Sequence, residues 1–192
     1  GSSAHLAAVE LREKALRVAA ALLPVPAGEL ALGDGGIHVR GKPKTRLGFG
    51  DVARAVAGIP GFALPAGIPP GLEASGHFVR DEMAFANGAA VAEVDVDADT
   101  GAVALSRFVI AHDCGRVINP MIVEGQIVGA VAHGVGNALF EWMRFDENCQ
   151  PLTTSFADYL LVSATEMPRV EVLHRESPSP LNPLGVKGVG EG

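Results

Sequence analysis

The chain has 192 residues, enough for one domain or at most two small ones, and 22 Asp and Glu against 15 Lys and Arg give it a formal net charge of −7. This acidity argues against a nucleic-acid-binding protein, which needs a basic surface to displace counterions. A hydrophobic content of 48% argues against disorder, and two cysteines, Cys114 and Cys149, are too few for a disulfide scaffold, a four-cysteine metal site or an iron–sulfur cluster in this chain.

Residues 4–23 have the periodicity of an amphipathic helix. The apolar positions that share one face of this helix are Leu11, Ala15, Val18 and Leu22. Ser2 or Ser3 is a natural N-cap, and Pro24 ends the helix.

Turn residues interrupt the chain after this helix. A glycine-rich turn at 33–36 separates two short predicted strands, residues 49–57 suggest a short helix, and 59–72, with four prolines, are expected to form a connecting loop. Basic side chains alternate in this region at His38, Arg40, Lys42, Lys44 and Arg46. On one extended segment they would share a face, which is either a solvated strand face or a phosphate-binding edge.

The clearest local pattern is a β-hairpin. Valines at 91–96 lead into the turn residues 97–101, and apolar residues at 103–110 lead out of it. A glycine-containing helix is expected at 122–142 and a last strand at 170–173, before a proline-rich segment at 178–183. Helices and hairpin strands in mixed order predict an α+β fold, with a mixed sheet that contains the hairpin and with helices packed on it.

The predicted helix 122–142 contains glycines that fit two interpretations. They either allow close packing of a buried helix, in which a substitution such as Gly129→Leu would overpack the core, or they expose backbone to a flat ligand. Gln126 and His133 lie two turns apart on one face, and a buried Gln needs hydrogen-bonding partners from protein or from a heterocycle. The nearly apolar run at 127–140 is too short to span a bilayer.

Two further groups of residues can carry chemistry. Glu191 lies between two glycines, so it is either an exposed loop carboxylate or a carboxylate to which a substrate has free access, with Lys187 four residues before it. His112 and Cys114 suggest a nucleophile pair, although a strand end that enters a turn explains the same residues. The spacing of Gly188 and Gly190 does not match a dinucleotide-binding fingerprint.

Together these residues resemble a known family. Asp113-Cys114-Gly115, Asn119-Pro120, Glu124-Gly125-Gln126, Gly134-Val135-Gly136 and Glu141 are followed by Thr154-Ser155-Phe156, Asp158-Tyr159 and Gly185-Val186-Lys187-Gly188-Val189-Gly190-Glu191. This order is similar to the C-terminal part of the molybdenum-binding large subunit of the xanthine oxidase family, which includes aldehyde oxidases and aerobic carbon monoxide dehydrogenases. The resemblance covers essentially the whole chain, more weakly at 24–75.

The resemblance implies a role for several of these residues. Glu191 matches the general base that accepts a proton while an electron-poor C–H carbon of the substrate is oxidised, a role that suits a carboxylate in a dry pocket. Gln126 matches a glutamine that hydrogen-bonds the pterin cofactor, and Lys187 and Gly190 would lie beside the base and the cofactor. Gly1, Ser2 and Ser3 match a loop that binds the cofactor's phosphate at a helix N-terminus; a cloning remnant is the alternative origin of these three residues. His133 departs from the glutamine that many relatives carry at this position.

The resemblance also implies what the chain works with. The cofactor is molybdopterin, expected in its cytosine dinucleotide form in the full-length enzyme and absent from this chain alone. The metal is held by the pterin, so no metal ligand is expected here. The expected partners are the N-terminal half of the same large subunit, iron–sulfur and FAD subunits or domains, and a small-molecule substrate.

Residues 1–192 are thus predicted to be the C-terminal molybdopterin-binding region of a cytoplasmic molybdenum hydroxylase. Because the chain stops inside a glycine-rich stretch, we expect the natural protein to continue after Gly192. One alternative is a non-catalytic assembly module of the same fold, in which Glu191 would be idle. The other is an independent enzyme that uses Cys114.

Overall fold

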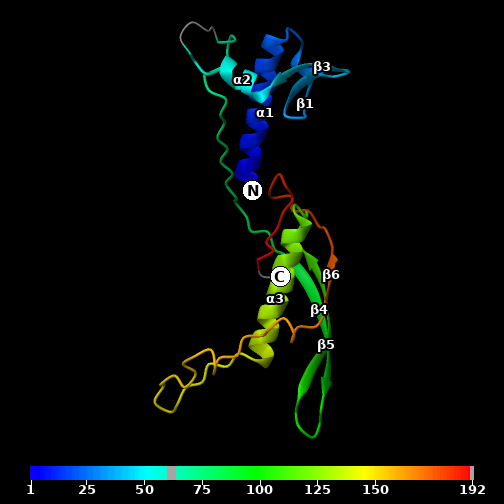
Figure 1. Ribbon diagram of the computed structural model, residues 1–192, viewed down its shortest axis with the longest axis vertical. Coiled ribbons are helices and arrows are strands. Elements are labelled where there is room, and N and C mark those ends of the chain that lie inside the picture. Colours follow the sequence, from blue (N-terminus) through cyan, green and yellow to red (C-terminus); the bar gives the residue numbers. More distant parts are fainter. Residues whose placement is uncertain (60–63, 191–192) are drawn as a thin grey trace. The chain divides into compact units, whose positions relative to one another are not determined.

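A computed structural model describes residues 1–59 and 64–190, with α+β architecture (Figure 1). The chain divides into two compact units, Gly1–Val79 and Arg80–Gly192. Within the described residues, neither of the two long helices has the length and apolarity that a bilayer crossing requires. Part of the predicted loop 59–72, at 60–63, lies outside the described residues, and the rest of it contains neither helix nor strand.

The first unit packs two helices against a small antiparallel sheet. Its elements are α1 Ser2–Leu22, the short 3-10 helix η1 Ala27–Glu29, β1 Leu30–Gly33, β2 Gly36–Val39, β3 Lys42–Gly48 and α2 Phe49–Ala55. The strands are ordered β1-β2-β3. The turn between β1 and β2 places Asp34 and Gly35 at positive φ, as a two-residue hairpin turn requires. The core of this unit is formed by Ala15, Val18, Ala19, Leu30, Ile37, Val39, Val52 and Val56.

The start of α1 differs from the sequence prediction. Gly1, and neither Ser2 nor Ser3, is the N-cap, and no side chain caps the helix. The hydroxyl of Ser3 instead accepts a hydrogen bond from the backbone N–H of Phe78 at 3.1 Å. The N-terminal serines therefore leave the first backbone N–H groups of α1 without a side-chain cap.

The basic segment 38–46 is not one extended strand, so that prediction was wrong. The chain reverses direction between Val39 and Lys42, and β2 and β3 pair as antiparallel neighbours with His38 opposite Arg46. Gly41, at a φ of 74°, takes the left-handed conformation that this reversal needs. The alternating basic residues are thereby distributed over two strands and a turn.

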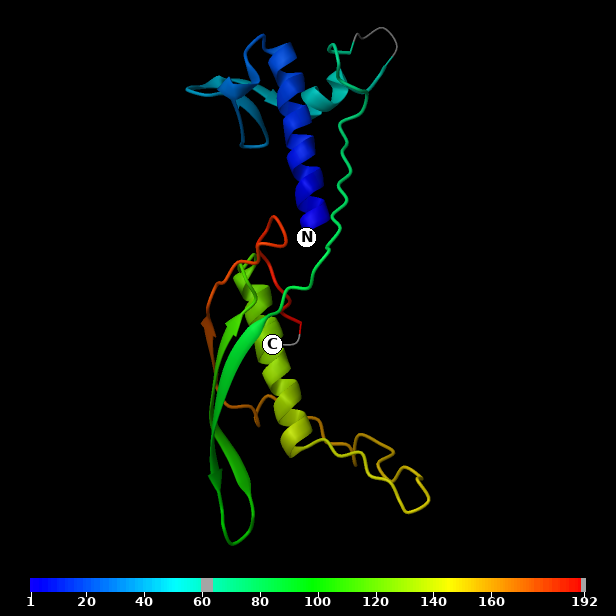
Figure 2. The same ribbon diagram turned by 180° about the vertical axis from the view of Figure 1, so that it is seen from behind.

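The second unit contains a mixed three-stranded sheet and one long helix. Strands β4 Asn87–Val96 and β5 Val103–Asp113 form the predicted hairpin, and β6 Val170–His174 adds to β5 in parallel. Helix α3 Pro120–Leu139 lies along the sheet in both views (Figures 1 and 2). The core between helix and sheet is formed by Ile110, Cys114, Val123, Ile127, Val131 and Val135.

Both ends of α3 follow from local chemistry. The side chain of Asn119 accepts a hydrogen bond from the backbone N–H of Ile122, and Pro120 takes the first helical turn, where no partner is needed for its nitrogen. At the other end, the N–H groups of Phe140 and Glu141 both bond the carbonyl of Gly136, so the helix stops before the predicted residue 142.

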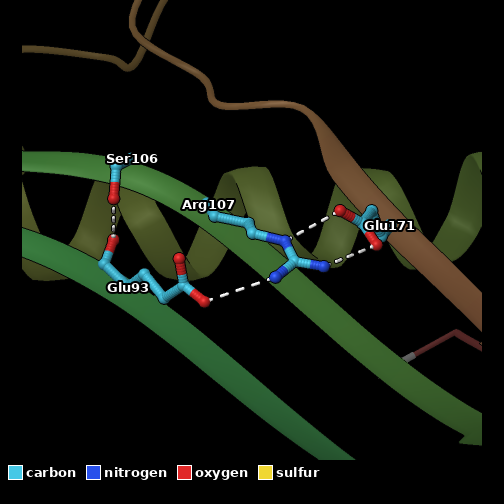
Figure 3. Close-up of polar contacts among 4 residues, drawn as sticks. All are labelled: Glu93, Ser106, Arg107 and Glu171. Carbon is cyan, nitrogen blue, oxygen red and sulfur yellow. Dashed lines mark hydrogen bonds and ion pairs between the residues drawn. The ribbon is translucent and has the colours of Figure 1, made fainter.

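An exposed ion-pair network joins the three strands of this sheet (Figure 3). Arg107 on β5 donates two hydrogen bonds to Glu171 on β6, at 2.8 and 3.0 Å, and contacts Glu93 on β4 at 3.4 Å. The hydroxyl of Ser106 donates to the backbone carbonyl of Glu93 at 3.0 Å. Because the side chains of Glu93, Arg107 and Glu171 are about half exposed, water screens these ion pairs and the network contributes little to stability.

Candidate functional site

The two ends of the sequence signature meet at the carboxyl end of β5. The backbone N–H of Lys187 donates to the carbonyl of Cys114 at 2.7 Å, and the N–H of Arg116 donates to the carbonyl of Gly185 at 2.9 Å. Gly115 and Val186 form an antiparallel bridge between these contacts. We call this arrangement the C-terminal clasp, defined by Asp113, Cys114, Gly115, Asn182, Gly185 and Lys187.

Asp113 is the polar centre of the clasp. One carboxylate oxygen accepts hydrogen bonds from the backbone N–H groups of Gly115 at 2.8 Å and Ser177 at 3.1 Å. The other accepts from Nζ of Lys187 at 2.8 Å. The side chains of Asp113 and Lys187 are only 14% and 10% exposed, so this ion pair is shielded from water far better than the Arg107 network.

Asn182 closes the other side of the clasp. Its side-chain amide donates to the carbonyl of Val186 at 2.8 Å and accepts from the N–H of the same residue at 3.0 Å. The carbonyl of Gly185 accepts a second hydrogen bond, from Ser179, at 3.1 Å. The segment 185–187 is thus bonded on both sides, which fixes the chain four residues before Glu191.

The position of Gly115 accepts only glycine. Its φ is 71°, and a Cβ atom there would collide with the carbonyl oxygen of Gly185 and approach the backbone nitrogen of Lys187 at 3.1 Å. The Asp-Cys-Gly motif therefore has a physical reason: the carboxylate binds the lysine, and the glycine lets the two backbones approach.

We expect the clasp to be sensitive to acid. The hydrogen bond from Lys187 lowers the pKa of Asp113 below its ordinary value, against a smaller opposing effect of burial. A carboxyl whose pKa is lowered on folding stabilises the fold fully above the unfolded value of about 3.9, and this stabilisation is lost as the pH falls through the lower folded value. An NMR titration of the Asp113 carboxyl carbon should therefore give a midpoint below about 3.9. A midpoint at or above that value would contradict the ion pair.

His112 and Cys114 do not form a nucleophile pair. Both side chains are 4% exposed, and burial lowers the pKa of His112 and raises the pKa of Cys114. Each group is thereby held in its neutral form, whereas a reactive cysteine needs a stabilised thiolate. Nδ1 of His112 is buried and, among the residues that the structure describes, has no hydrogen-bonding partner. The side chain of Cys114 packs in the core, and its backbone carbonyl accepts a hydrogen bond in the clasp.

The outer face of α3 differs from the buried helix that the glycines suggested. Gln126 and His133 share a face, and both are exposed, which favours exposed backbone over close packing of a buried helix. A Cβ atom added at Gly125, Gly129 or Gly134 would meet no atom within 4 Å in the described structure. These glycines do not serve packing within this unit, and they leave an open backbone surface beside Gln126.

Two alanine substitutions test this assignment of faces. Gly129→Ala should stabilise α3 in this chain by about 0.5–1 kcal/mol, because alanine favours a helix and the added methyl group meets nothing. Gly136→Ala should give no such gain, because its Cβ would displace the carboxylate of Glu141, which accepts a 2.5 Å hydrogen bond from Tyr159. Amide exchange along α3 measures both effects. Destabilisation by Gly129→Ala would mean that this face is covered after all.

The remaining predicted site residues lie in different surroundings. Glu191 lies outside the described residues, while Gly190 is exposed and a Cβ there would meet no described atom within 4 Å. Gly1, Ser2 and Ser3 form the start of α1 in the first unit. In the described part of the chain, no group of three or more His, Cys, Asp or Glu side chains is arranged to hold a metal ion.

Sequence reasoning missed the partner of Lys187. The described contact joins this lysine to Asp113, 74 residues away. The expectation that Lys187 lies near Glu191 stays a prediction, because Glu191 lies outside the described residues. The sequence did offer one indication: the two residues have opposite charges, and each lies in a glycine-containing motif at one end of the signature. The hydrogen bond between Tyr159 and Glu141 was also missed, because the two residues are remote in sequence, although both belong to the signature.

Comparison with known proteins gives consistent matches over the whole chain. The sequence profile described as the molybdopterin cofactor-binding domain matches residues 1–168. The chain is 38% identical over its full length to the 6-hydroxypseudooxynicotine dehydrogenase complex subunit gamma of Paenarthrobacter nicotinovorans, covering 24% of that protein. It is 36% identical to the carbon monoxide dehydrogenase large chain of Afipia carboxidovorans, covering 23% of it.

Solved structures agree with these sequence matches. Quinoline 2-oxidoreductase from Pseudomonas putida 86 superimposes with a TM-score of 0.81 at 37% identity, over 96% of this chain and 23% of that one. Reconstituted CO dehydrogenase from Oligotropha carboxidovorans gives a TM-score of 0.81 at 36% identity, over 97% and 23%. The chain thus spans about a quarter of the length of the proteins that it matches.

Proposed function

Because this chain belongs to the molybdopterin cofactor-binding domain family, we propose that it works as part of the large subunit of a molybdenum-dependent oxidoreductase. The observation that carries the proposal is the clasp, in which the two halves of the family-like signature, 113–115 and 185–187, are bonded to each other. The relatives that match this chain are named as dehydrogenases and oxidoreductases. The proposed reaction is oxidation of an aldehyde, a heterocycle or a small carbon compound.

The open face of α3 fits a flat cofactor. Gly125 and Gly129 present backbone without a Cβ, and the exposed amide of Gln126 can both donate and accept hydrogen bonds to a pterin ring. Bound molybdopterin would supply the molybdenum centre at which the substrate C–H carbon is oxidised. Gln126 would hold the pterin in register on this face.

The proposed base and phosphate contacts come from the two chain ends. Glu191 would accept the proton that is released as the substrate is oxidised, and Gly190 would leave the approach to this carboxylate free of side chains. The uncapped N–H groups at Gly1, Ser2 and Ser3 would bind a phosphate of the cofactor, for which we propose the cytosine dinucleotide form. Lys187 retains two further N–H donors for the cofactor beside its bond to Asp113.

The proposed partners follow from the same reasoning. One relative is named as a subunit of a complex and another as a large chain. We infer that the rest of this large subunit supplies the other half of the cofactor site, and that iron–sulfur and FAD subunits or domains carry the electrons away. A cytoplasmic location stays a prediction from the sequence.

Metal and pterin analysis of the full-length protein, purified with its partner subunits, tests this function. We expect near-stoichiometric molybdenum together with a cytosine nucleotide released from the pterin. Gln126→Ala should lower the cofactor content, whereas Glu124→Ala, also exposed on α3 two residues earlier, should not.

This chain alone should bind no molybdenum, because half a site leaves the polar groups of the cofactor unpaired. A full-length complex without molybdenum or pterin would contradict the proposal and favour a non-catalytic assembly module. Stoichiometric molybdenum on the isolated chain would contradict the half-site account.

A further inference from the structure

We propose that a cavity beside the middle of α1 is a carboxylate-binding site, in which Lys14 is the principal binding group. The cavity lies in the first unit and is lined by none of the residues to which the proposed function assigns a role. The inference therefore goes beyond the proposed function and does not depend on it.

Lys14 is a charged residue on the buried face of α1. Its exposed fraction is 6%, and it lies beside Ala15 and one turn before Val18, which both belong to the core of the first unit. Lysine is almost never buried to this extent without a partner, because its ammonium group loses hydration that nothing else replaces. The burial of Lys14 therefore indicates that an acidic group pairs with it.

The described part of the chain supplies no such group. Within it, Lys14 takes part in no ion pair and in no side-chain hydrogen bond. In the same part of the chain, Nδ1 of His112 is the one side-chain polar atom that is both fully enclosed and without a partner. Nζ of Lys14 is therefore not sealed in the core, and it is accessible from the cavity that Lys14 lines.

The cavity has a volume of about 470 Å³, enough for a small organic acid or for an acidic side chain. It lies between α1 and residues 69–75, and the charged residues that line it are Glu10, Lys14, Arg17 and Glu73.

The wall opposite α1 is fixed to that helix. The segment 69–78 runs along α1 in both views (Figures 1 and 2). The hydroxyl of Ser3 accepts a hydrogen bond from the N–H of Phe78 at 3.1 Å, and a Cβ atom at Gly76 would approach the backbone of Ser3 and Ala7 to 2.6 Å. The cavity is thus formed by two elements that are held together.

The charges around the cavity favour a carboxylate over a phosphate. Lys14 is desolvated, whereas the other three charged residues, Glu10, Arg17 and Glu73, are exposed and screened by water. The two glutamates repel an anion in proportion to its charge, so a dianion is repelled about twice as strongly as a carboxylate. The two oxygens of a carboxylate can also accept hydrogen bonds from Lys14 and Arg17 together.

Acetate titration of this chain tests the site. As acetate replaces chloride at constant ionic strength, the NMR signal of the Lys14 ε-methylene group should shift until it saturates, and dianionic phosphate should bind more weakly. Lys14→Met should weaken acetate binding, followed at the amides of residues 10–17, by at least about 10-fold. Lys44→Met is the matched control, because it removes an exposed lysine of the same unit and should leave acetate binding unchanged.

A stability measurement keeps the result for Lys14→Met interpretable. Methionine is similar in size to lysine and removes an unpaired buried charge, so the thermal midpoint of this variant in chloride should rise. Acetate should raise the midpoint of the unchanged chain but not that of Lys14→Met, because only a folded site that binds acetate is stabilised by it.

The carboxylate can come from a small acid in solution or from an Asp or Glu side chain in the rest of the large subunit, since this chain spans about a quarter of the proteins that it matches. Carbodiimide cross-linking of the full-length enzyme separates these sources. A cross-link from Lys14 to an acidic residue outside this chain identifies a side chain. A thermal midpoint of the enzyme that rises with acetate, and no longer does so in Lys14→Met, identifies a small acid.

Three results would overturn the site. They are a Lys14 signal in this chain that does not respond to acetate, equal acetate binding by Lys14→Met, and tighter binding of phosphate than of acetate. None of these readouts depends on molybdenum or on turnover, so the proposed function is tested separately.

Discussion

Glu191→Gln in the full-length enzyme should keep the cofactor and lower the rate of substrate oxidation by about 10²–10⁴-fold, the usual contribution of a general base. Glutamine is nearly isosteric with glutamate, so folding and pterin binding should survive. Its amide cannot accept the proton that the reaction releases. Both sequence neighbours of residue 191 are glycines, so no adjacent side chain can replace the carboxylate.

The measurement is the rate at which excess substrate reduces the molybdenum-loaded variant in a single turnover. Glu147→Gln is a suitable control, because Glu147 is an exposed glutamate in a turn and has no proposed role. It should react at the rate of the unchanged enzyme. A rate within a few-fold of that enzyme for Glu191→Gln would show that another group takes the proton.

Gly115→Ala should open the C-terminal clasp. A non-glycine residue at positive φ costs about 1–2 kcal/mol, and the overpacking against the carbonyl of Gly185 should add about 1–3 kcal/mol. The strain can be relieved only by moving segment 185–187 away from β5. We therefore expect faster amide exchange at Arg116 and Lys187 in this chain, and loss of turnover in the full-length enzyme.

Gly101→Ala separates the two costs. Gly101 has a φ of 74°, close to that of Gly115, but a Cβ atom there would meet nothing within 4 Å in the described structure. This variant should show the conformational cost alone, confined to the hairpin turn, with the clasp unaffected. Equal effects of Gly101→Ala and Gly115→Ala on residue 187 would refute the close approach of the two backbones.

Local chemistry made several elements predictable from the sequence. The hairpin of β4 and β5 was predictable because alternating valines flank a turn rich in Asp and Gly, and Asp97 indeed bonds the N–H groups of Asp99 and Thr100. The periodicity of apolar residues predicted α1, a glycine-containing helix was expected at 122–142 where α3 spans Pro120–Leu139, and the mixed order of elements correctly indicated an α+β fold.

Other features depend on contacts that are remote in sequence. The open face of α3 was not predictable, because glycines serve equally in tight packing and in open backbone, and only the position of the sheet decides between them. The partner of Lys187 was hidden because Asp113 is 74 residues away. The reversal at Gly41 was missed because the alternation of basic residues continues across the turn.

The parallel pairing of β6 with β5 has a consequence for the order of folding. The β4–β5 hairpin joins two strands that are adjacent in sequence. Strand β6, in contrast, is separated from β5 by α3 and by the long segment after α3, so this whole stretch must be synthesised before β6 can pair. Closing so long a loop lowers the entropy of the chain before any stabilising contact forms, and strand pairings of this kind therefore form slowly. The second half of the clasp, at 182–187, follows β6 in the chain, so we expect the clasp to form last. A nascent chain would then form α3, the helix proposed to face the cofactor, before it can fix its proposed catalytic loop.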